Sequence, residues 1–432
     1  MKTLYSWVIA THVAALLFIA SPPVDAQLAA SGTPGDRAVY TIGGGASIEP
    51  GLGNSVAHNF ATTAVDDTAD SFDLQAGGAV NLTAGHHLVI YGTRYLNTNP
   101  GIATRAGLDN TILINGSPIS YGAASSYSRD GNNNNNFVRG GSIVEVAQGD
   151  SVGFESKRTD NNPQNRIAQQ DADLQLVKLD DSLSYLRLSA SANAANLISN
   201  TSAGPSAVSY DVQDEIDAGF THASGTSDIT LDEAGRYLVF ANTGFRISGG
   251  NRHRQAITQR LAINGTPVED SSTVVYIRYS GSGDGLGGLM VTGASSVGTI
   301  IQTTADNSVL NVEVLRDNNP ATTNTAVALE AALTGLTILK LPNYGEVIRL
   351  SGPSQEINAA QGNPETPLNL SDVSPVSNAS FSYDAGSSVS QVTVNKDGDY
   401  LFLASHFLDD YDTPPGEART ITRQVFQNIP NG

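Results

Sequence analysis

Internal repetition is the feature that most constrains how this chain can fold. The segment LTAGHHLVIYG begins at Leu82, LDEAGRYLVFAN begins at Leu231, and VNKDGDYLFLAS begins at Val394. Each is followed by a second match: LDNTILING, ITQRLAING and ITRQVFQN. A period of roughly 150 to 160 residues is the length of a whole domain and far exceeds a solenoid unit. We therefore expect an array of similar domains, the third of which stops partway through its pattern and is truncated.

The repeats also predict the domain boundaries. The first copy is expected over 39–180, the second over 184–342, and the third over 346–432, where EVIRLSG echoes the SYLRLSA of the second copy. A Gly/Ala/Ser-rich lead-in over 27–38 is expected to be flexible. Only a few residues separate adjacent copies, so relative motion of the domains should be limited.

The first 26 residues resemble a secretory signal peptide. Lys2 supplies the positive start, WVIATHVAALLFIA from Trp7 is short for a membrane span, and Val24 and Ala26 are small residues before a cleavage point at Gln27. The alternative is an uncleaved N-terminal anchor. The chain is expected to be secreted or at the cell surface, with no membrane association after cleavage.

Alternating apolar residues predict an all-β chain. In the strand that ends at Asn115-Gly116, Leu108, Ile112 and Ile114 fall on one face, together with the polar Asn110. Asn-Gly recurs at 264–265, and this pair tolerates the positive φ of a tight hairpin turn. Polar, Gly-rich segments from Gly131 and from Ser280 are expected to be equivalent long loops. The fold class is therefore tandem antiparallel β-sandwiches.

Composition excludes several classes of function. The chain has no cysteine, so an exported protein of this kind depends on packing and not on disulfides. A net charge of −19 argues against a nucleic-acid partner, because phosphates need clustered Lys and Arg. The same charge makes cation binding plausible.

The order of signals within one copy resembles the globular jelly-roll domain of the complement component 1q and tumour necrosis factor families. A Gly-aromatic-Leu strand comes first, and VEVAQGDSVGFESKR from Val144 and the closing strands LQLVKL and LTILKL follow in the family's order. The chain departs from the pattern at His87, which stands in place of the aromatic residue, and it has no collagen-like stalk. The resemblance implies jelly-roll domains and heads that associate as threefold trimers.

No catalytic constellation is recognisable. His86 and His87 look like a metal pair, but neighbouring strand residues face opposite sides, so we expect one at the core edge and one in solvent. There is no Cys nucleophile, no G-x-S-x-G elbow and no HExxH spacing. No cofactor is expected with certainty, and the chain is not expected to be an enzyme.

One polar cluster recurs. RTDNNP and RDNNP place Asp160 and Asn161 in the first copy and Asp317 and Asn318 in the second at the end of a strand. Their hard oxygen atoms suit calcium, whereas Asp and Asn before proline also form structural turns. Both interpretations stay open, and calcium is the only candidate ligand ion.

Two classes of function remain. The first is a secreted non-enzymatic binding, adhesion or structural protein made of repeated modules, which would gain avidity for an extracellular protein or glycan. The alternative is a carbohydrate-active enzyme, or its accessory region, with the catalytic part outside this chain. The copies could form an intramolecular pseudo-trimer, self-associate, or extend as a linear string, which the acidic charge would favour.

Overall fold

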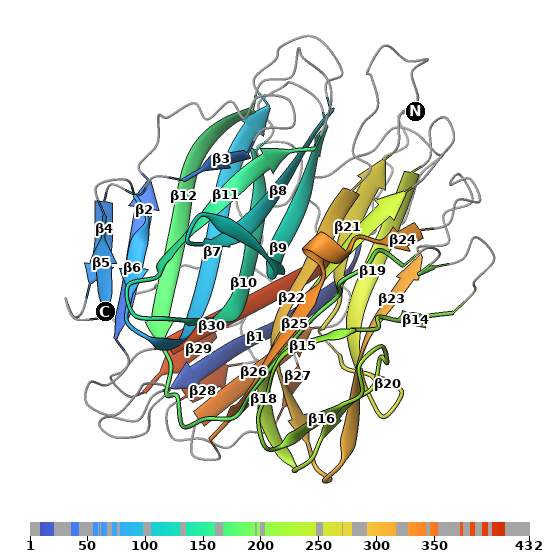
Figure 1. The fold of residues 1–432 in the computed structure, drawn as a ribbon. Helices are drawn as coiled ribbons and strands as arrows, with labels where there is room; N and C mark the ends of the chain where they lie inside the picture. The colour runs from blue at the N-terminus through green and yellow to red at the C-terminus, as the bar shows by residue number, and fades with distance from the viewer. Residues whose placement is uncertain are drawn as a thin grey trace.

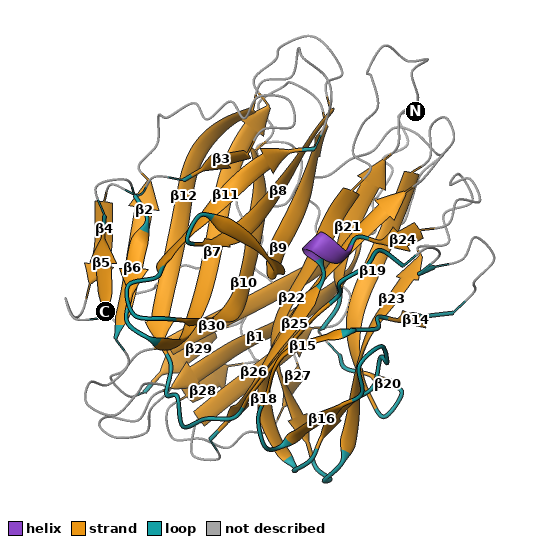
Figure 2. Ribbon diagram, viewed as in Figure 1, coloured by secondary structure: helices purple, strands orange, loops and turns teal. Residues whose placement is uncertain are grey.

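The computed structural model describes residues 9–20, 36–42, 55–58, 60, 62–66, 71–75, 78–97, 105–129, 135–159, 167–194, 197–198, 204–247, 254–269, 271–278, 292–316, 327–342, 346–352, 372–374, 381–384, 391–395 and 400–410. These residues form antiparallel β-strands and one short helical turn, η1 (Ala331–Leu333), as Figure 2 shows. No helix in the described ranges is long and apolar enough to cross a membrane. The all-β class is confirmed.

The first sandwich consists of two sheets (Figure 1). One has the order β10-β7-β12-β2-β4, and the other has the order β5-β6-β11-β8-β9 with β3 paired to β11. Its strands are β2 (Arg37–Ile42), β3 (Ser55–Ala57), β4 (Thr62–Asp66), β5 (Phe72–Leu74), β6 (Val80–Leu82), β7 (Gly85–Asn97), β8 (Arg105–Ile114), β9 (Ser117–Arg129), β10 (Asn135–Val146), β11 (Ser151–Arg158) and β12 (Ile167–Lys178).

The second sandwich repeats this arrangement. One sheet has the order β15-β13-β25-β18-β22 with β24 on β18, and the other has the order β16-β17-β23-β19-β20 with β14 on β23 and β21 on β19. Its strands are β13 (Tyr185–Ser189), β14 (Ser206–Ala207), β15 (Val212–Ile216), β16 (Phe220–His222), β17 (Ile229–Leu231), β18 (Gly235–Ile247), β19 (Arg254–Ile263), β20 (Thr266–Pro267), β21 (Thr273–Arg278), β22 (Thr292–Thr303), β23 (Ser308–Arg316), β24 (Val327–Leu329) and β25 (Gly335–Leu341). In both sandwiches the closing strand lies between the first strand and the Gly-aromatic-Leu strand, which is the jelly-roll order.

The local signals produce the expected geometry. Asn115 and Asn264 both have φ of 51°, and the glycines that follow both have φ of 75°, so each Asn-Gly pair forms its tight turn between strands. On β8, Leu108, Asn110 and Ile112 are buried in the core of the first sandwich. Asn110 is tolerated there because its side chain donates to Thr93 Oγ1 at 2.9 Å and accepts from Ser156 Oγ at 2.7 Å.

The two sandwiches share a third apolar cluster besides their own cores. It contains Leu88, Ile143 and Leu179 from the first copy, and Tyr185, Leu238, Phe240, Ile300, Leu339 and Leu341 from the second. Leu88 and Leu238 occupy equivalent places in their sheets, because each is paired both with the closing strand and with Ile143 or Ile300. Equivalent residues of the two copies therefore contribute to the same apolar cluster.

Strands of the third copy form another sheet together with one N-terminal strand, in the order β27-β26-β1-β30. It contains β1 (Ile9–Ala20), β26 (Glu346–Gly352), β27 (Asp372–Ser374) and β30 (Tyr400–Asp410), and β28 (Phe381–Asp384) pairs with β29 (Gln391–Val394). In Figure 1 the blue β1 runs beside the red β30. β30 also lies against β21 and β22 of the second copy.

Two expectations about irregular segments need correction. The lead-in does not extend to residue 38, because β2 begins at Arg37 and Ala38 is fully buried. The predicted long loop from Gly131 is shorter than expected, because residues from Asn135 onward pair with β7 in β10. The run of asparagines hid the strand, since Asn is depleted in strands by propensity and pairing with β7 overrides that preference.

Candidate functional site at the interface of the first two sandwiches

A cluster of charged side chains lies beside the shared apolar cluster. His86 comes from the start of β7, Glu145 from the neighbouring β10, Arg187 from β13 and Glu215 from β15. Asp181 lies in the short connection between the two copies. The site therefore exists only where the first sandwich meets the second.

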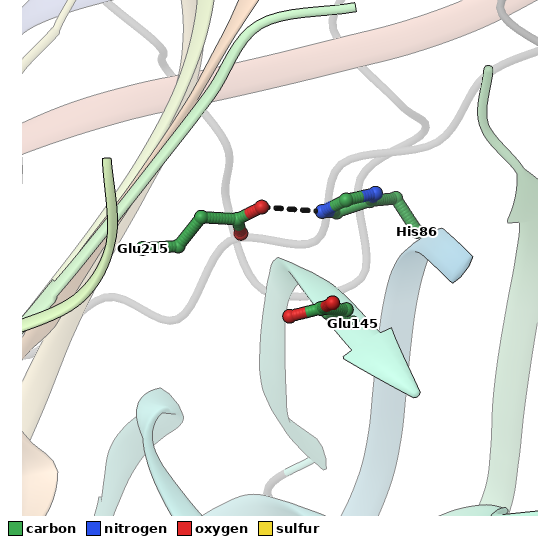
Figure 3. Close-up of side chains that lie close together, drawn as sticks. All are labelled: His86, Glu145 and Glu215. Atoms are coloured by element: carbon green, nitrogen blue, oxygen red, sulfur yellow. Dashed lines mark hydrogen bonds and ion pairs between the residues drawn. The ribbon is translucent and has the colours of Figure 1, made fainter. Parts of the chain in front are cut away.

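His86 is the centre of the cluster. Its Nε2 lies 2.8 Å from Glu215 Oε1, and its Nδ1 lies 3.0 Å from Asp181 Oδ1, which also accepts the backbone N–H of His86 at 2.8 Å. The imidazole stacks on the Tyr185 ring with centroids 3.7 Å apart and planes at 2°. Figure 3 shows Glu215 reaching the ring from the second copy, with Glu145 below it. Both ring nitrogens are thus held by carboxylates.

Arg187 joins the other side of the cluster. Its Nη2 donates to Glu145 Oε2 at 2.9 Å and lies 3.6 Å from Glu215 Oε2. The guanidinium carbon is 5.6 Å from the centroid of the Tyr121 ring, within reach of a cation–π contact. Since Glu145 and Tyr121 belong to the first copy and Arg187 to the second, this side chain links the two domains directly.

These contacts shift the acid–base equilibria of the cluster. Burial alone would lower the pKa of His86, but the hydrogen bond and charge of Glu215 and of Asp181 outweigh it, so the pKa is raised. Burial acts to raise the pKa of Glu215, yet the hydrogen bond and charge of His86 and the charge of Arg187 lower it overall. The Glu215 carboxylate therefore stays ionised, and the imidazole of His86 holds its proton to a higher pH than a free histidine.

The charges balance when His86 is protonated. Glu145, Glu215 and Asp181 contribute three negative charges, while Arg187 and Lys178, which lies 3.1 Å from Asp181, contribute two positive ones. The imidazolium supplies the third. A buried charge is costly unless it is paired, so a carboxylate on each ring nitrogen favours the protonated ring.

The same residues could be considered as metal ligands. One ligand atom each from His86, Glu145 and Glu215 lie within 4.8 Å of one another. However, the Arg187 guanidinium contacts both glutamates, so a metal ion there would face a fixed positive charge in the same small space. The side chains around His86 therefore suit a protonated imidazole better than a bound metal ion.

A second polar contact crosses the interface at β9. The backbone N–H of Ala294 in the second copy donates to Ser125 Oγ at 2.6 Å, and Ser125 Oγ donates to Asp109 Oδ1 at 2.5 Å. Burial raises the pKa of Asp109 to about 7, and the Ser125 hydrogen bond opposes that rise. A carboxyl group that is partly neutral at physiological pH thus lies next to the domain contact.

His87 has the opposite surroundings to His86. Its side chain is fully buried in the first sandwich, with its ring 5.9 Å from that of Phe72 at an angle of 70°. Burial, and next the charge of Lys178, lower the pKa of His87 to about 3. The imidazole is therefore neutral throughout the physiological range.

The sequence-based expectation for the histidine pair was half right. His87 is inside, as its alignment with Tyr237 suggested, but His86 is not in solvent: only 8% of it is exposed, because the second copy covers it. Alternation specifies which face a residue takes and not what later packs on that face. The sequence did contain one indication that this surface is covered. Arg187 and Glu215 form a charged pair in register between neighbouring strands of the second copy.

The expected calcium ligands Asp160, Asn161, Asp317 and Asn318 lie outside the described residues. The strands that precede them, β11 and β23, end at the equivalent residues Arg158 and Arg316. Calcium binding stays a prediction.

Comparison with known proteins gives only distant similarity. No family model matches this chain, and no curated protein matches it. Among solved structures, murine APRIL is 12% identical with a TM-score of 0.25 and covers 37% of this chain and 98% of its own. The tandem CBM22-1–CBM22-2 domain of Paenibacillus barcinonensis Xyn10C is 13% identical, with a TM-score of 0.17, and covers 72% and 100%. PNGF-II is 9% identical, with a TM-score of 0.25, and covers 71% and 66%.

Likenesses at this level carry no argument about function, and nothing in them is specific to the complement component 1q family. The jelly-roll assignment rests on the strand order of the two sandwiches.

Proposed function

We propose that this chain is a secreted or cell-surface, non-enzymatic binding protein whose jelly-roll domains form one rigid multivalent unit. The observation that carries the proposal is the apolar cluster shared by the first two copies. Domains that pack through an apolar surface, flanked by the His86 and Arg187 contacts, keep a fixed relative orientation. Fixed orientation raises the effective concentration of a second binding site once the first is occupied.

The arrangement of the strand ends supports this proposal. β7, β9 and β11 end on the same side of the first sandwich, and β18, β21 and β23 end on the corresponding side of the second, at the top of Figure 1. The polar, Gly-rich sequences around 131–134 and 280–288 leave from these ends. Connections at one end of a rigid scaffold are the usual place for binding residues.

We further propose that the three copies form an intramolecular pseudo-trimer. The β9–β10 edge of the first copy packs on the β18–β25 sheet of the second, and the β21–β22 edge of the second lies against β1 and β30 of the third sheet. The same edge-to-face contact is thus used twice, and a repeated head-to-tail contact closes into a ring when its rotation permits. Leu401 pairs in the place of Leu88 and Leu238, which puts an apolar residue at the corresponding position of the third copy.

Ligand arrays provide the test of the binding function. The purified protein, applied to arrays of glycans and of extracellular proteins, should be retained by surfaces with dense ligand and far less by sparse ones, because retention depends on avidity. The control is Gly335→Ala, which disturbs the interface without touching either strand-end surface. Equal retention on dense and sparse surfaces would contradict multivalency, and turnover of a soluble polysaccharide would favour the enzyme alternative.

Calcium binding is tested separately. If Asp160 and Asp317 hold the ion, calcium should raise the melting temperature through preferential binding to the folded state. The double variant Asp160→Ala and Asp317→Ala should lose that rise. A parent protein whose melting temperature does not respond to calcium would leave the turn as the role of these residues.

Small-angle scattering tests the pseudo-trimer. A radius of gyration close to that of one compact body is expected, and a value typical of an elongated string would refute it.

A further inference from the structure

The third sheet takes one of its central strands from the opposite end of the chain. β26 and β30 occur in the third copy, yet they are not neighbours, because β1 lies between them and is antiparallel to both. In the first two copies this place belongs to the closing strand, β12 or β25, which follows the other strands of its own domain. The N-terminal segment thus stands where a closing strand belongs.

The register of β1 is that of a closing strand. In the second copy Leu339 is paired with both Tyr185 and Leu238. In the third sheet Ile19 is paired with both Val347 and Leu401. Val347 and Leu401 are the counterparts of Tyr185 and Leu238 in the repeated sequences EVIRLSG and GDYLFLAS. Ile19 therefore takes the place of Leu339.

The agreement continues along the strand. Leu17 pairs with Arg349 and Leu403, just as Thr337 pairs with Arg187 and Phe240. A slip of one residue would exchange the two faces of the strand, so a matched register over successive residues is a strong constraint. The register of β1 with both neighbours changes only between Val13 and Leu16.

The composition of the segment suits this place. IATHVAALLFIA has no Asp, Glu, Lys or Arg and no Pro or Gly. A strand with neighbours on both sides must offer a backbone donor at each paired position, so proline is excluded. Two strands left with facing open edges are a ready template for such a segment.

We infer that Ile9–Ala20 serves as a donated strand between β26 and β30 of the third domain, in the register of β25. The segment that resembles a signal peptide then has a second role as the closing strand of the third domain. The segment cannot pair in the sheet and bind a membrane or a signal peptidase at the same time, because the same backbone groups are needed for both. Removal of the segment leaves β26 and β30 without the strand that pairs with both.

Cysteine cross-linking tests the pairing in the chain of residues 1–432, which contains no cysteine that would interfere. Adjacent pairs in an antiparallel ladder have Cα atoms about 4.5 and 5.5 Å apart in alternation, and both separations permit a disulfide. Leu17→Cys with Leu403→Cys, or Phe18→Cys with Phe402→Cys, should therefore form an intramolecular cross-link under mild oxidation. The control, Leu17→Cys with Phe407→Cys, is displaced along β30 by roughly 14 Å and should not. No cross-link in either pair, or equal cross-linking of the control, overturns the inference.

Hydrogen exchange tests the same inference without substitutions. Amides of 346–352 and 400–410 should exchange at least about tenfold more slowly in the chain of residues 1–432 than in a chain that starts at Gln27, while those of β13 and β18 serve as internal references. A synthetic peptide of residues 9–20 should restore the protection to the shorter chain, and the Leu17→Pro peptide should not. Equal exchange in both chains, or protection by both peptides, refutes strand donation.

Discussion

The buried imidazole of His87 should make the first sandwich sensitive to acid. In the folded chain its pKa lies at about 3, against 6.5 for an exposed histidine, because burial disfavours the charged form. Below pH 6.5 the unfolded chain binds a proton at this residue and the folded chain does not. Stability contributed by neutral His87 is therefore complete above pH 6.5 and is lost as the pH falls from 6.5 toward 3.

The size of the effect follows from the shift. Each pKa unit corresponds to about 1.4 kcal/mol, so the loss is ~2 kcal/mol at pH 5 and ~4 kcal/mol at pH 3, and it approaches ~5 kcal/mol only below pH 3. For a domain of this size, 2 kcal/mol lowers the melting temperature by roughly 4 to 8 °C. The variant His87→Tyr should remove this dependence, because a phenol does not titrate in this range.

Tyrosine is a suitable replacement because the second copy already uses it. Tyr237 stands at the equivalent position with its ring 5.9 Å from Phe220 at 64°, and His87 makes the same kind of contact with Phe72 at 5.9 Å and 70°. The variant should therefore pack in the existing space.

The assay is thermal unfolding of parent and variant at a series of pH values between 7 and 4, followed by circular dichroism. Asp109 opposes His87 in the parent, because its pKa near 7 makes stability fall as the pH rises from 3.8 to 7. The difference between the two proteins cancels that contribution. The reasoning is refuted if the difference in melting temperature between parent and variant stays constant from pH 7 to pH 4.

Three further predictions concern the interface. Because the pKa of His86 is raised, its contribution is complete below pH 6.5 and is lost as the pH rises through its folded-state pKa. The protection of the β13 amides, measured relative to the intrinsic exchange rate at each pH, should therefore fall on the alkaline side in the parent and not in His86→Phe. In Gly335→Ala the new Cβ would lie 2.4 Å from Tyr121 Cβ, so the domains must move apart at a cost of roughly 1 to 3 kcal/mol, whereas Gly153→Ala, with nothing within 4 Å, should leave unfolding unchanged. Asp109→Asn should raise the melting temperature above pH 7, where the parent must ionise a buried carboxyl group. A lower melting temperature in the variant would show that the ionised carboxylate stabilises the folded chain.

Sequence patterns predicted most of the strand organisation. The Asn-Gly pairs fixed two turns, and alternation on Leu108, Asn110 and Ile112 identified the face of β8 that enters the core of the first sandwich. Both are local properties of the backbone and of side-chain period, so they can be recognised before any contact is known. The repeat then transfers each assignment from one copy to the next, which is why the closing strands were recognised in both.

The candidate site could not be predicted in the same way. His86 and Glu215 are far apart in sequence and meet only because the sheet of one copy packs on that of the next. The repeat itself gives no hint, because the counterpart of His86 in the second copy is Arg236 and the counterpart of Glu145 is Gln302.

What the sequence determined by itself is therefore the antiparallel strand pattern and the face on which each strand residue lies, since both follow from periods of two residues and from turn chemistry. The jelly-roll order was expected only from the resemblance to a known family, and the pairing of the strands established it. Only the tertiary structure decided that Leu88 and Leu238 share one apolar cluster, that His86 is buried between carboxylates, and that Ile9–Ala20 closes the third sheet. These depend on which surfaces meet, and hydrophobic burial is not directional. A pattern can specify an apolar face without naming the surface that covers it.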